Sequence, residues 1–317
     1  MPVTFIDVTE ELAGQRLDNF LFSRLKGVPK SKVYNIIRKG EVRVNKGRSK
    51  PTYKLLAGDK VRVPPVKTAS RAEVKVSHDL SKLLESSVVF EDRHWLVMNK
   101  PNELAVHGGS GLSLGLVEAL RKMRPQDSFL ELCHRIDKAT SGCVVLARRR
   151  SALKVFHQCL REKKLQKHYL AMTVGRWPNS TNAVKLALQK NNLSSGERIV
   201  KVDPEGKRSV THFAIKERLK GYTLVEAKPI TGRTHQIRVH CQAVGHAIVG
   251  DEKYGNRTVN QQASKNGFRS LFLHARAIEL PVIDEDGQHD RSLPPRIIKS
   301  PMPEFWAEFM SSHQNDS

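Results

Sequence analysis

The sequence predicts an α+β protein in which the larger of two domains is built on a mixed, largely antiparallel sheet. Beyond about residue 85, β-rich runs are numerous and short, and no regular helix follows each of them as a doubly wound βαβ array requires. A short segment of two helices followed by strands precedes them. The length of 317 residues also favours two domains, since one domain usually takes roughly 100–200 residues.

The N-terminal segment begins with two helices and continues with two strands. Apolar residues recur at helical spacing in the first helix: Leu17, Phe20, Leu21 and Leu25. The second helix is expected to start with Ser31 as its N-cap and to stop at Gly40. The strands are expected at 41–45, with two valines on one face, and at 60–63.

Positive charge is concentrated in this N-terminal segment. Of the net charge of +22, residues 16–75 carry +13, from 17 Lys and Arg against four acids. Such an excess repels itself unless a polyanion or a solvated surface absorbs it. Both a basic helix face offered to RNA and a merely solvated basic face fit this distribution.

The run RLDNFLFSRLKGVPKSKVYNIIRKGEVRVN resembles the S4 RNA-binding domain, whose pattern covers residues 16–63. We expect an S4-like domain over 1–64, a linker over 65–84 and the larger domain over 85–317, because the stretch between the domains loses periodicity and gains Pro, Ser, Thr and Lys. The cations expected to contact RNA are Arg16, Lys30, Lys32, Arg38, Lys39, Arg43 and Lys46.

The larger domain contains the β-rich runs that predict its sheet. They lie at 88–90, 95–98, 143–147, 169–174, 210–216, 222–227 and 271–280. The clearest helix is amphipathic and runs from 151 to about 163. The tail after about 311 is polar and is expected to fray.

Several protein classes are disfavoured by composition. The four cysteines form no CxxC pair and no framework of a small secreted domain, so we expect reduced, buried thiols. The amino terminus lacks a basic start that leads into an apolar stretch, and nowhere do about 18 apolar residues run together. We therefore expect a cytoplasmic protein without a membrane partner.

The most informative segment is HRIDKATSG at 134–142, in which Asp137 lies between basic and turn-forming residues just before an apolar run. A scaffold can hold such an acid firmly on a loop that enters a strand. An Asp near Ser and Gly is, however, also ordinary turn chemistry. The segment by itself leaves both roles open.

This segment matches the signature HRLDxxTSG of the RluA pseudouridine synthase family, in which the Asp is catalytic. Ile136 replaces the usual Leu, which conserves volume. The resemblance extends to NKP with VH beyond it, where Glu103 replaces a usual Gly, and to KHYL, GRTHQIRVH and LFLHA. It implies the pseudouridine synthase fold and an isomerase that converts uridine in RNA to pseudouridine.

The runs AGQRLDNFL, LKGVPKS, IRKGEVRVNK and VHGGSGLS resemble the branch of this family that modifies ribosomal RNA. The resemblance implies 23S, large-subunit ribosomal RNA as partner rather than transfer RNA. It leaves open which uridines are modified, whether the RNA is free or in a pre-ribosomal particle, and the oligomeric state.

The reaction breaks the bond from uracil N1 to ribose and rejoins the base through C5 without redox change, so no cofactor is expected. A carboxylate can act as a nucleophile or as a base near the sugar, and both roles remain open for Asp137. Because burial disfavours a charged carboxylate, a cation should lie beside it. The resemblance assigns that place to Arg233, whose planar fork can pair bidentately with a carboxylate.

The resemblance also implies three supporting residues. Tyr169 would stack on the uracil, although a Tyr in an apolar strand is otherwise a core residue. Arg135 would occupy the position that the target nucleotide vacates when it leaves its stack. Leu273 would form part of the apolar pocket wall, and plain core packing explains it equally well. No metal site is expected, because no HxxxH or HExxH spacing links the nearby histidines, His134, His235, His240 and His274.

Two other functions fit parts of the sequence. GLSLG at 111–115 satisfies the G-x-S-x-G pattern of serine hydrolases, but no apolar strand precedes Ser113 as a nucleophile elbow requires. A chain that merely binds RNA is the second alternative. A pure binder, however, has no need of Asp137 in a cleft that faces RNA, because the acid repels phosphate.

Overall fold

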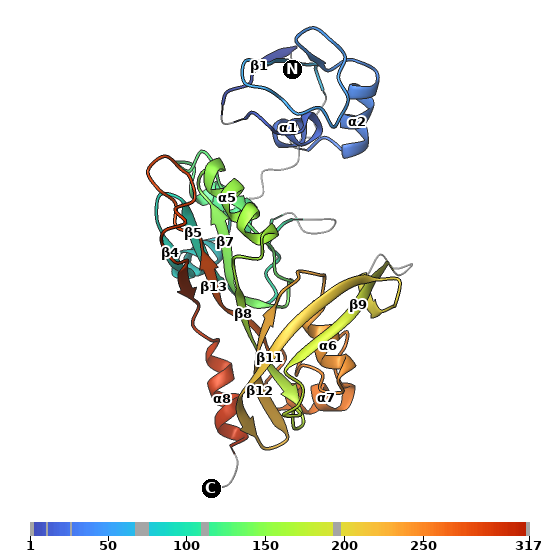
Figure 1. The fold of residues 1–317 in the computed structure, drawn as a ribbon, viewed down its shortest axis with the longest axis vertical. Coiled ribbons are helices and arrows are strands. Elements are labelled where there is room, and N and C mark those ends of the chain that lie inside the picture. The colour runs from blue at the N-terminus through green and yellow to red at the C-terminus, as the bar shows by residue number, and fades with distance from the viewer. Residues whose placement is uncertain are drawn as a thin grey trace. The chain divides into compact units, whose positions relative to one another are not determined.

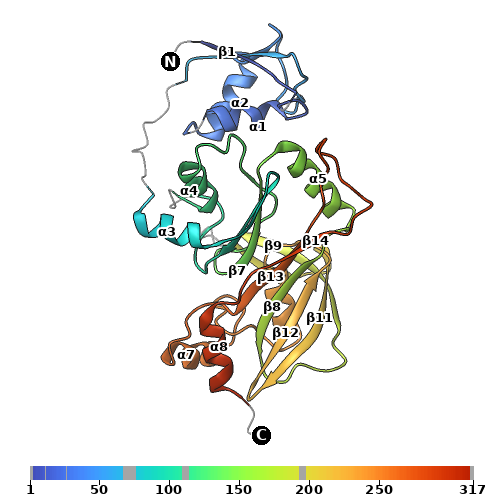
Figure 2. The same cartoon turned by 90° about the vertical axis from the view of Figure 1, so that its left-hand side faces the viewer.

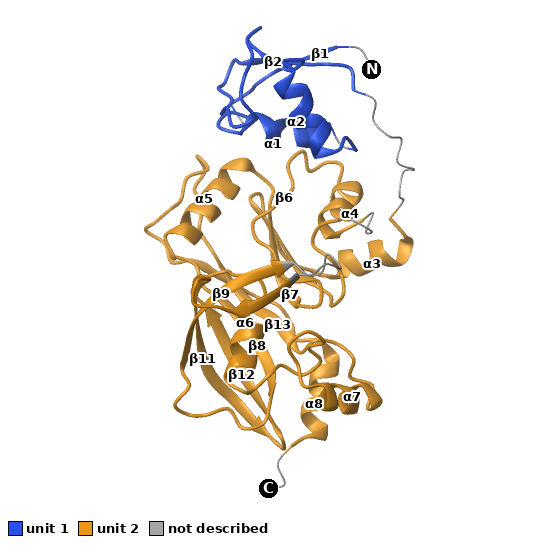
Figure 3. Cartoon of the chain, turned by 90° about the vertical axis from the view of Figure 1, so that its right-hand side faces the viewer, with its two compact units in different colours: residues 1–75 blue, residues 76–317 orange. Residues whose placement is uncertain are grey.

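The chain divides into two units, residues 1–75 and residues 76–317, which are described separately (Figure 3). The computed structural model describes residues 3–10, 12–25, 27–66, 76–108, 114–192 and 198–314. Within these ranges, no helix is long and apolar enough to cross a membrane. The four cysteines are buried and unpaired, as expected.

The first unit packs two helices against a three-stranded antiparallel sheet. Its elements are β1 (Thr4–Asp7), α1 (Leu17–Arg24), α2 (Lys30–Arg38), β2 (Arg43–Val44) and β3 (Lys60–Val63), with strand order β1-β3-β2. The apolar residues that recur along both helices form its core, and Leu17, Phe20 and Leu21 are fully buried. The expected order of two helices followed by two strands is confirmed, and β1 was not predicted.

Two boundaries in this unit differ from the sequence prediction. α2 begins at Lys30 directly after Pro29, so Ser31 lies inside the helix and is not its N-cap. The fixed backbone of Pro29, with φ of −55°, suits a chain that enters a helix. The predicted strand at 41–45 is reduced to β2, because Asn45 and Lys46 turn the chain with φ of 49° and 68°.

The second unit is built on one large mixed sheet (Figure 1). Its strands are β4 (Val88–Glu91), β5 (Trp95–Lys100), β6 (Glu131–Leu132), β7 (Ser141–Ala147), β8 (Lys167–Val174), β9 (Ala183–Asn192), β10 (Arg198–Val202), β11 (Lys207–Leu219), β12 (Tyr222–Pro229), β13 (Leu273–Leu280) and β14 (Arg296–Lys299). The main path is β10-β9-β11-β12-β8-β13-β7-β5-β4, with β14 beside β13 and β6 beside β7. Among the described strands, β13 and β7 pair in parallel and the other pairs are antiparallel, which confirms the predicted fold class.

The described residues of the second unit also form six helices. They are α3 (His78–Ser86), α4 (Leu116–Met123), α5 (Arg150–Arg161), α6 (Gln236–Ala243), α7 (Arg257–Lys265) and α8 (Glu304–Ser312). α5 packs on β7, and α6 packs on the strands from β9 to β12. Figure 2 shows α4 and α5 on either side of the end of β7. The tail that was expected to fray after 311 is helical up to Ser312, and Phe309 just before it is buried.

α3 corrects the predicted linker. The linker was expected over 65–84, but from Ser77 onward the chain is helical, and Ser77 accepts a hydrogen bond from the N–H of Leu80 at the start of α3. Leu84 is fully buried in the core of the second unit. The stretch is polar overall, but it contains two apolar residues at helical spacing, Leu80 and Leu84, which are consistent with a helix. Residues 67–75 of the predicted linker lie outside the described ranges.

The parallel junction of β7 with β13 positions the loop that precedes β7. Gly142 has φ of 104°, and a Cβ at this position would lie 2.3 Å from the carbonyl oxygen of Ala275. Ser141 Oγ lies 2.9 Å from His274 Nδ1. Because His274 Nε2 faces the carbonyl of Ser300, Nδ1 accepts the hydroxyl proton of Ser141. These contacts fix the last two residues of the signature segment, Ser141 and Gly142.

Candidate active site

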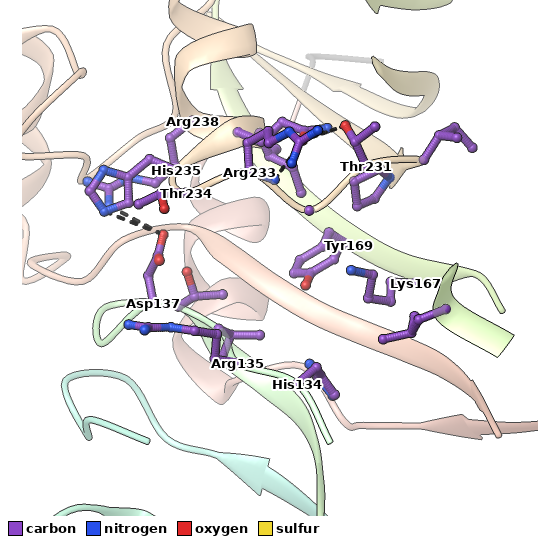
Figure 4. A pocket seen from close by; sticks show the side chains of 18 of the residues that line it. His134, Arg135, Asp137, Lys167, Tyr169, Thr231, Arg233, Thr234, His235 and Arg238 are labelled. Atoms are coloured by element: carbon purple, nitrogen blue, oxygen red, sulfur yellow. Dashed lines mark hydrogen bonds and ion pairs between the residues drawn. The ribbon is translucent and has the colours of Figure 1, made fainter. Parts of the chain in front are cut away.

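Asp137 lies in the loop between β6 and β7 and lines a cavity of about 510 Å³ (Figure 4). The cavity also takes lining residues from β8, β9, the loop before α6 and β13. The N–H of Thr140 donates to the Asp137 carbonyl at 3.1 Å, which closes a turn. The turn is therefore confirmed, and the Asp137 side chain lines the cavity, while its catalytic role stays a prediction.

Two side chains of the α6 region lie beside the Asp137 carboxylate. Arg238 Nη1 is 3.7 Å and His235 Nε2 is 3.9 Å from Asp137 Oδ2. Arg238 donates from Nε and Nη2 to both oxygens of Asp251, at 2.7 and 2.6 Å, and lies over the ring of Tyr254. Burial opposes the charge of Arg238, but the bonds to Asp251 outweigh it and raise the pKa of Arg238.

The cation beside Asp137 is therefore Arg238, and the expectation for Arg233 is wrong in this respect. Arg233 is exposed, and its Nε donates to the carbonyl of Arg208 at 3.3 Å. Figure 4 shows Arg233 near Thr231, apart from the carboxylate. The run GRTHQIRVH holds two arginines, and α6 begins at its Gln236. His235 and Arg238 are three residues apart, so helical spacing could have brought them together on one face.

His235 is held in a defined tautomer. Its Nδ1 lies 2.7 Å from the hydroxyl of Tyr254, and that hydroxyl accepts the N–H of Val200 at 2.9 Å. Tyr254 is buried, and His235 is the acceptor for its proton among the described residues, so Nε2 carries the imidazole proton toward Asp137. Burial lowers the pKa of His235, although Asp137 acts in the opposite direction. The backbone of His235 is left-handed, with φ of 52°.

The segment NKP at 99–101 and the residue that follows it hold the Asp137 loop through hydrogen bonds to its backbone carbonyls. Lys100 is fully buried and donates to the carbonyls of Pro101, Leu104 and Lys138, at 2.7, 2.9 and 2.9 Å. Burial lowers the pKa of Lys100 to about 7. A neutral amine has only two N–H groups, so three acceptors favour the ammonium form. Asn102 adds a bond to the carbonyl of Ala139 at 2.7 Å.

The structure brings the other predicted residues to the same cavity. Tyr169 and Leu273 line it from the adjacent strands β8 and β13, and both also belong to the hydrophobic core. Burial raises the pKa of Tyr169, so its phenol stays protonated. Arg135 is exposed and lines the cavity next to Asp137 in the chain. The nucleotide-binding roles expected for these three residues stay predictions.

The cations expected to bind RNA lie on the first unit. Arg43 is half-buried, and the other six are exposed: Arg16, Lys30, Lys32, Arg38, Lys39 and Lys46. Arg16 pairs with Asp18 through two hydrogen bonds at 3.1 and 2.6 Å, so part of its charge is already matched. Lys30 lies 5.4 Å from the ring centre of Phe22. Their role in RNA binding stays a prediction.

The histidines considered as metal ligands have separate partners. His240 Nε2 pairs with Ser209, His274 with Ser141, and His235 with Tyr254. Among the described residues, no group of three or more His, Cys, Asp or Glu gathers as a metal site would require. Ser113 of the hydrolase-like pattern lies outside the described ranges.

Two family models match the chain. A model described as RNA pseudouridylate synthase matches residues 94–243, and a model of the S4 domain matches residues 15–61. The second match confirms the resemblance of the N-terminal segment to an S4 domain. The first covers the Asp137 loop, Tyr169, and both arginines of the α6 region.

Curated relatives match nearly the whole chain. "Ribosomal large subunit pseudouridine synthase C" of Pasteurella multocida (strain Pm70) is 52% identical over 94% of this chain and 92% of its own. The protein of the same name from Escherichia coli (strain K12) is 53% identical over 87% of this chain and 88% of its own. The solved structure of "Human RNA Pseudouridylate Synthase Domain Containing 4" has a TM-score of 0.57 and 27% identity, covering 72% of this chain and 93% of that one. The chain therefore belongs to the RNA pseudouridylate synthase family and carries an S4 domain at its N-terminal side.

Proposed function

We propose that this pseudouridine synthase isomerises uridines of large-subunit ribosomal RNA and that Asp137 is its catalytic carboxylate. The observation that carries the proposal is the isolation of Asp137. It is the one acid among the described residues that line the cavity, and it faces Arg238 and His235.

The geometry around Asp137 suits a reactive carboxylate. Arg238 places a positive charge beside the carboxylate, but its Nε and Nη2 are committed to Asp251, and Nη1 stays at 3.7 Å from Asp137. This distance gives electrostatic support without a close hydrogen bond, so the oxygens of Asp137 retain lone pairs for the substrate. Either role of Asp137, nucleophile or base near the sugar, needs this ionised and accessible form.

The surrounding residues suit a uridine that has left its helix. Tyr169 offers an aromatic face for the detached uracil, and such stacking contributes about 1–3 kcal/mol per base. Leu273 supplies an apolar wall beside it. Arg135, exposed at the cavity, fills the place of the extruded nucleotide, which offsets part of the few kcal/mol that unstacking costs.

Large-subunit ribosomal RNA is the substrate that fits both the charge and the relatives. The net charge of +22 suits a polyanion, and the curated relatives at 52–53% identity are named for the large ribosomal subunit. The S4 domain, through its exposed cations, captures the RNA, while the larger domain, from about residue 76, carries the reaction. A ribosomal RNA substrate also implies that the protein acts in the cytoplasm.

The proposal is tested by offering the full chain three transcripts: large-subunit ribosomal RNA, small-subunit ribosomal RNA and transfer RNA. Pseudouridine is then mapped at nucleotide resolution. We expect modification at defined uridines of the large-subunit transcript, and none with Asp137→Asn. Modification of transfer RNA alone would overturn the substrate, and RNA binding without modification of any transcript would favour the pure binder.

A further inference from the structure

Four cations of the cavity lining have no role in holding Asp137. Lys163 follows α5, Lys167 lies on β8, Lys190 lies on β9, and Arg233 lies in the loop before α6. We call these four residues the cationic rim. Four separate elements thus direct positive charge toward one cavity.

Lys167 is the most informative member of the rim. It precedes Tyr169 by two residues on β8, so both side chains point to the same face of the sheet. Figure 4 shows Lys167 beside Tyr169, on the side away from Asp137. The side chain is half-buried, and among the described residues it makes no ion pair or side-chain hydrogen bond. Burial lowers the pKa of Lys167. Burial, and to a smaller extent the charge of Lys167, lower the pKa of His134 to about 3.

Lys163 is held in an unfavourable backbone conformation. Its φ is 56°, in the left-handed region that favours glycine at the end of a helix. The N–H groups of Lys163 and Lys164 bond back to the carbonyls of Leu160 and Cys159, which closes the end of α5. A lysine is more strained at this position than a glycine, and such strain is typical of functional sites.

The charge balance of the cavity leaves the rim without a counter-charge. Asp137 lies beside Arg238, and Arg238 is in turn neutralised by Asp251. No second acid lines the cavity within the described residues. Charges that are withdrawn from water are normally paired. We therefore expect the half-buried ammonium of Lys167 to bind an anion from outside the chain.

We propose that the cationic rim binds a backbone phosphate of a nucleotide next to the target uridine, with Lys167 as its central contact. This inference rests on the proposed function, because it takes RNA as the ligand of the cavity. A phosphodiester carries the full negative charge that the ammonium of Lys167 lacks as a partner, whereas the edge of a base needs only single donors. Lys167 Nζ would lie 3.6 Å from a Cβ added at Gly232, so the ammonium faces the loop that also carries Arg233.

The first test is the salt dependence of RNA binding by the full chain. A large-subunit ribosomal RNA transcript is titrated at several salt concentrations with wild type, Lys167→Met and Lys164→Met. Lys164 is the matched control, because it is exposed, pairs with Glu162 at 2.7 Å and does not line the cavity. We expect Lys167→Met to reduce the slope of log affinity against log salt by about 0.7–0.9 and to weaken binding about tenfold, and Lys164→Met to change neither.

Steady-state kinetics separate a phosphate contact from a contact to the base. Lys167→Met should raise KM with kcat changed less than about threefold, because a phosphate contact is made equally in the ground and transition states. Lys167→Arg should restore the slope. An unchanged slope, or a large fall in kcat at unchanged slope, would overturn the phosphate assignment, and so would an equal slope change in Lys164→Met. Unfolding midpoints within the error of wild type exclude a folding defect, and Lys190→Met provides a second rim variant if Lys167→Met is unstable.

A final arm locates the phosphate. Once the modified uridine is mapped, each flanking phosphate of a short substrate is replaced by an uncharged methylphosphonate. At one position the losses from Lys167→Met and from the methylphosphonate should be non-additive, and additive losses at every flanking position would contradict the inference. If wild type isomerises uridine but the slope does not respond, the rim inference fails alone. If the slope responds without any isomerisation, the proposed function fails, and the rim binds RNA for another purpose.

Discussion

Arg238 Nη1 lies 3.7 Å from Asp137 Oδ2, while the remaining edge of the same guanidinium holds both oxygens of Asp251. Asp251 therefore fixes the position from which Arg238 meets Asp137. The guanidinium also lies over Tyr254, whose hydroxyl holds His235. The two groups that face Asp137 are thus positioned by one buried network.

Arg238→Lys should reduce kcat far more than Arg233→Lys does. A lysine cannot bridge Asp251 and Asp137 with a planar fork, and loss of a preorganised charged donor costs about 10²–10³ in kcat. Arg233→Lys should act mainly on KM, because Arg233 lies on the cationic rim. The measurement is steady-state kinetics with both variants. Equal kcat for Arg238→Lys and wild type would show that Arg238 does not support the reaction.

Lys100→Met should destabilise the second unit. The change leaves three buried carbonyls without their donor, and we expect the free energy of unfolding to fall by about 2–5 kcal/mol. Lys138→Met is the control, because Lys138 is exposed and its partner among the described residues is exposed Glu103. Urea unfolding should place that control within about 0.5 kcal/mol of wild type. Equal stability of the two variants would mean that Lys100 is not an anchor of the Asp137 loop.

Gly142→Ala should disrupt the junction of β7 with β13. The new Cβ would meet the backbone oxygen of Ala275 at 2.3 Å, which no side-chain adjustment can relieve. Gly245→Ala is a matched control, because Gly245 has φ of 82° but open space around it, so only the left-handed backbone is strained, at about 1–2 kcal/mol. We expect the thermal midpoint to fall much further for Gly142→Ala. A similar fall in both variants would refute the clash.

The protein should lose stability in mild acid. Burial lowers the pKa of His240 and of His274 to about 4, below their ordinary value of 6.5. Between these values the unfolded chain binds more protons, so the stability is fully present above pH 6.5 and is lost as pH falls toward 4. Ser209 donates to the carbonyl of Leu186, so it accepts from His240 Nε2. His240 Nδ1 has no partner for a second proton within the described part of the chain. His240→Gln should therefore flatten the dependence of the urea midpoint on pH, and an unchanged dependence would argue against this cause.

Deletion of residues 1–75 should weaken capture of ribosomal RNA while the second unit keeps its stability. The deletion removes the S4 domain with its exposed cations but leaves α3 in place. Deletion of residues 1–86 should also destabilise the second unit, because it removes fully buried Leu84, and loss of such a leucine costs about 2–5 kcal/mol. Undiminished RNA binding after the shorter deletion would contradict the role of the S4 domain.

Elements with strong apolar patterns could be predicted from the sequence. β7 is an unbroken apolar run that is buried throughout, and α5 has a clear amphipathic pattern. α3 was missed because its few apolar residues lie in a polar stretch. α6 was missed because its buried face includes Gln236, Arg238 and His240, polar residues that tertiary contacts satisfy.

Site residues could be predicted where a sequence motif includes them. They could not be predicted where two residues of one motif are distinguished only by their tertiary contacts. Asp137, Tyr169 and Leu273 follow from the signature segments, and they share one cavity. The choice of Arg238 over Arg233 depends on the start of α6 and on Asp251, thirteen residues further along the chain. The anchoring by Lys100 runs through backbone carbonyls, which leave no trace in side-chain patterns.

The catalytic role of Asp137 is tested most directly by the release of tritium from large-subunit ribosomal RNA that carries uridine labelled at C5. Isomerisation through C5 must displace this label, and Asp137→Asn keeps the size of the side chain while removing its charge. We expect release by wild type and none above background by a folded Asp137→Asn protein. Equal release by both proteins would contradict the catalytic role of Asp137.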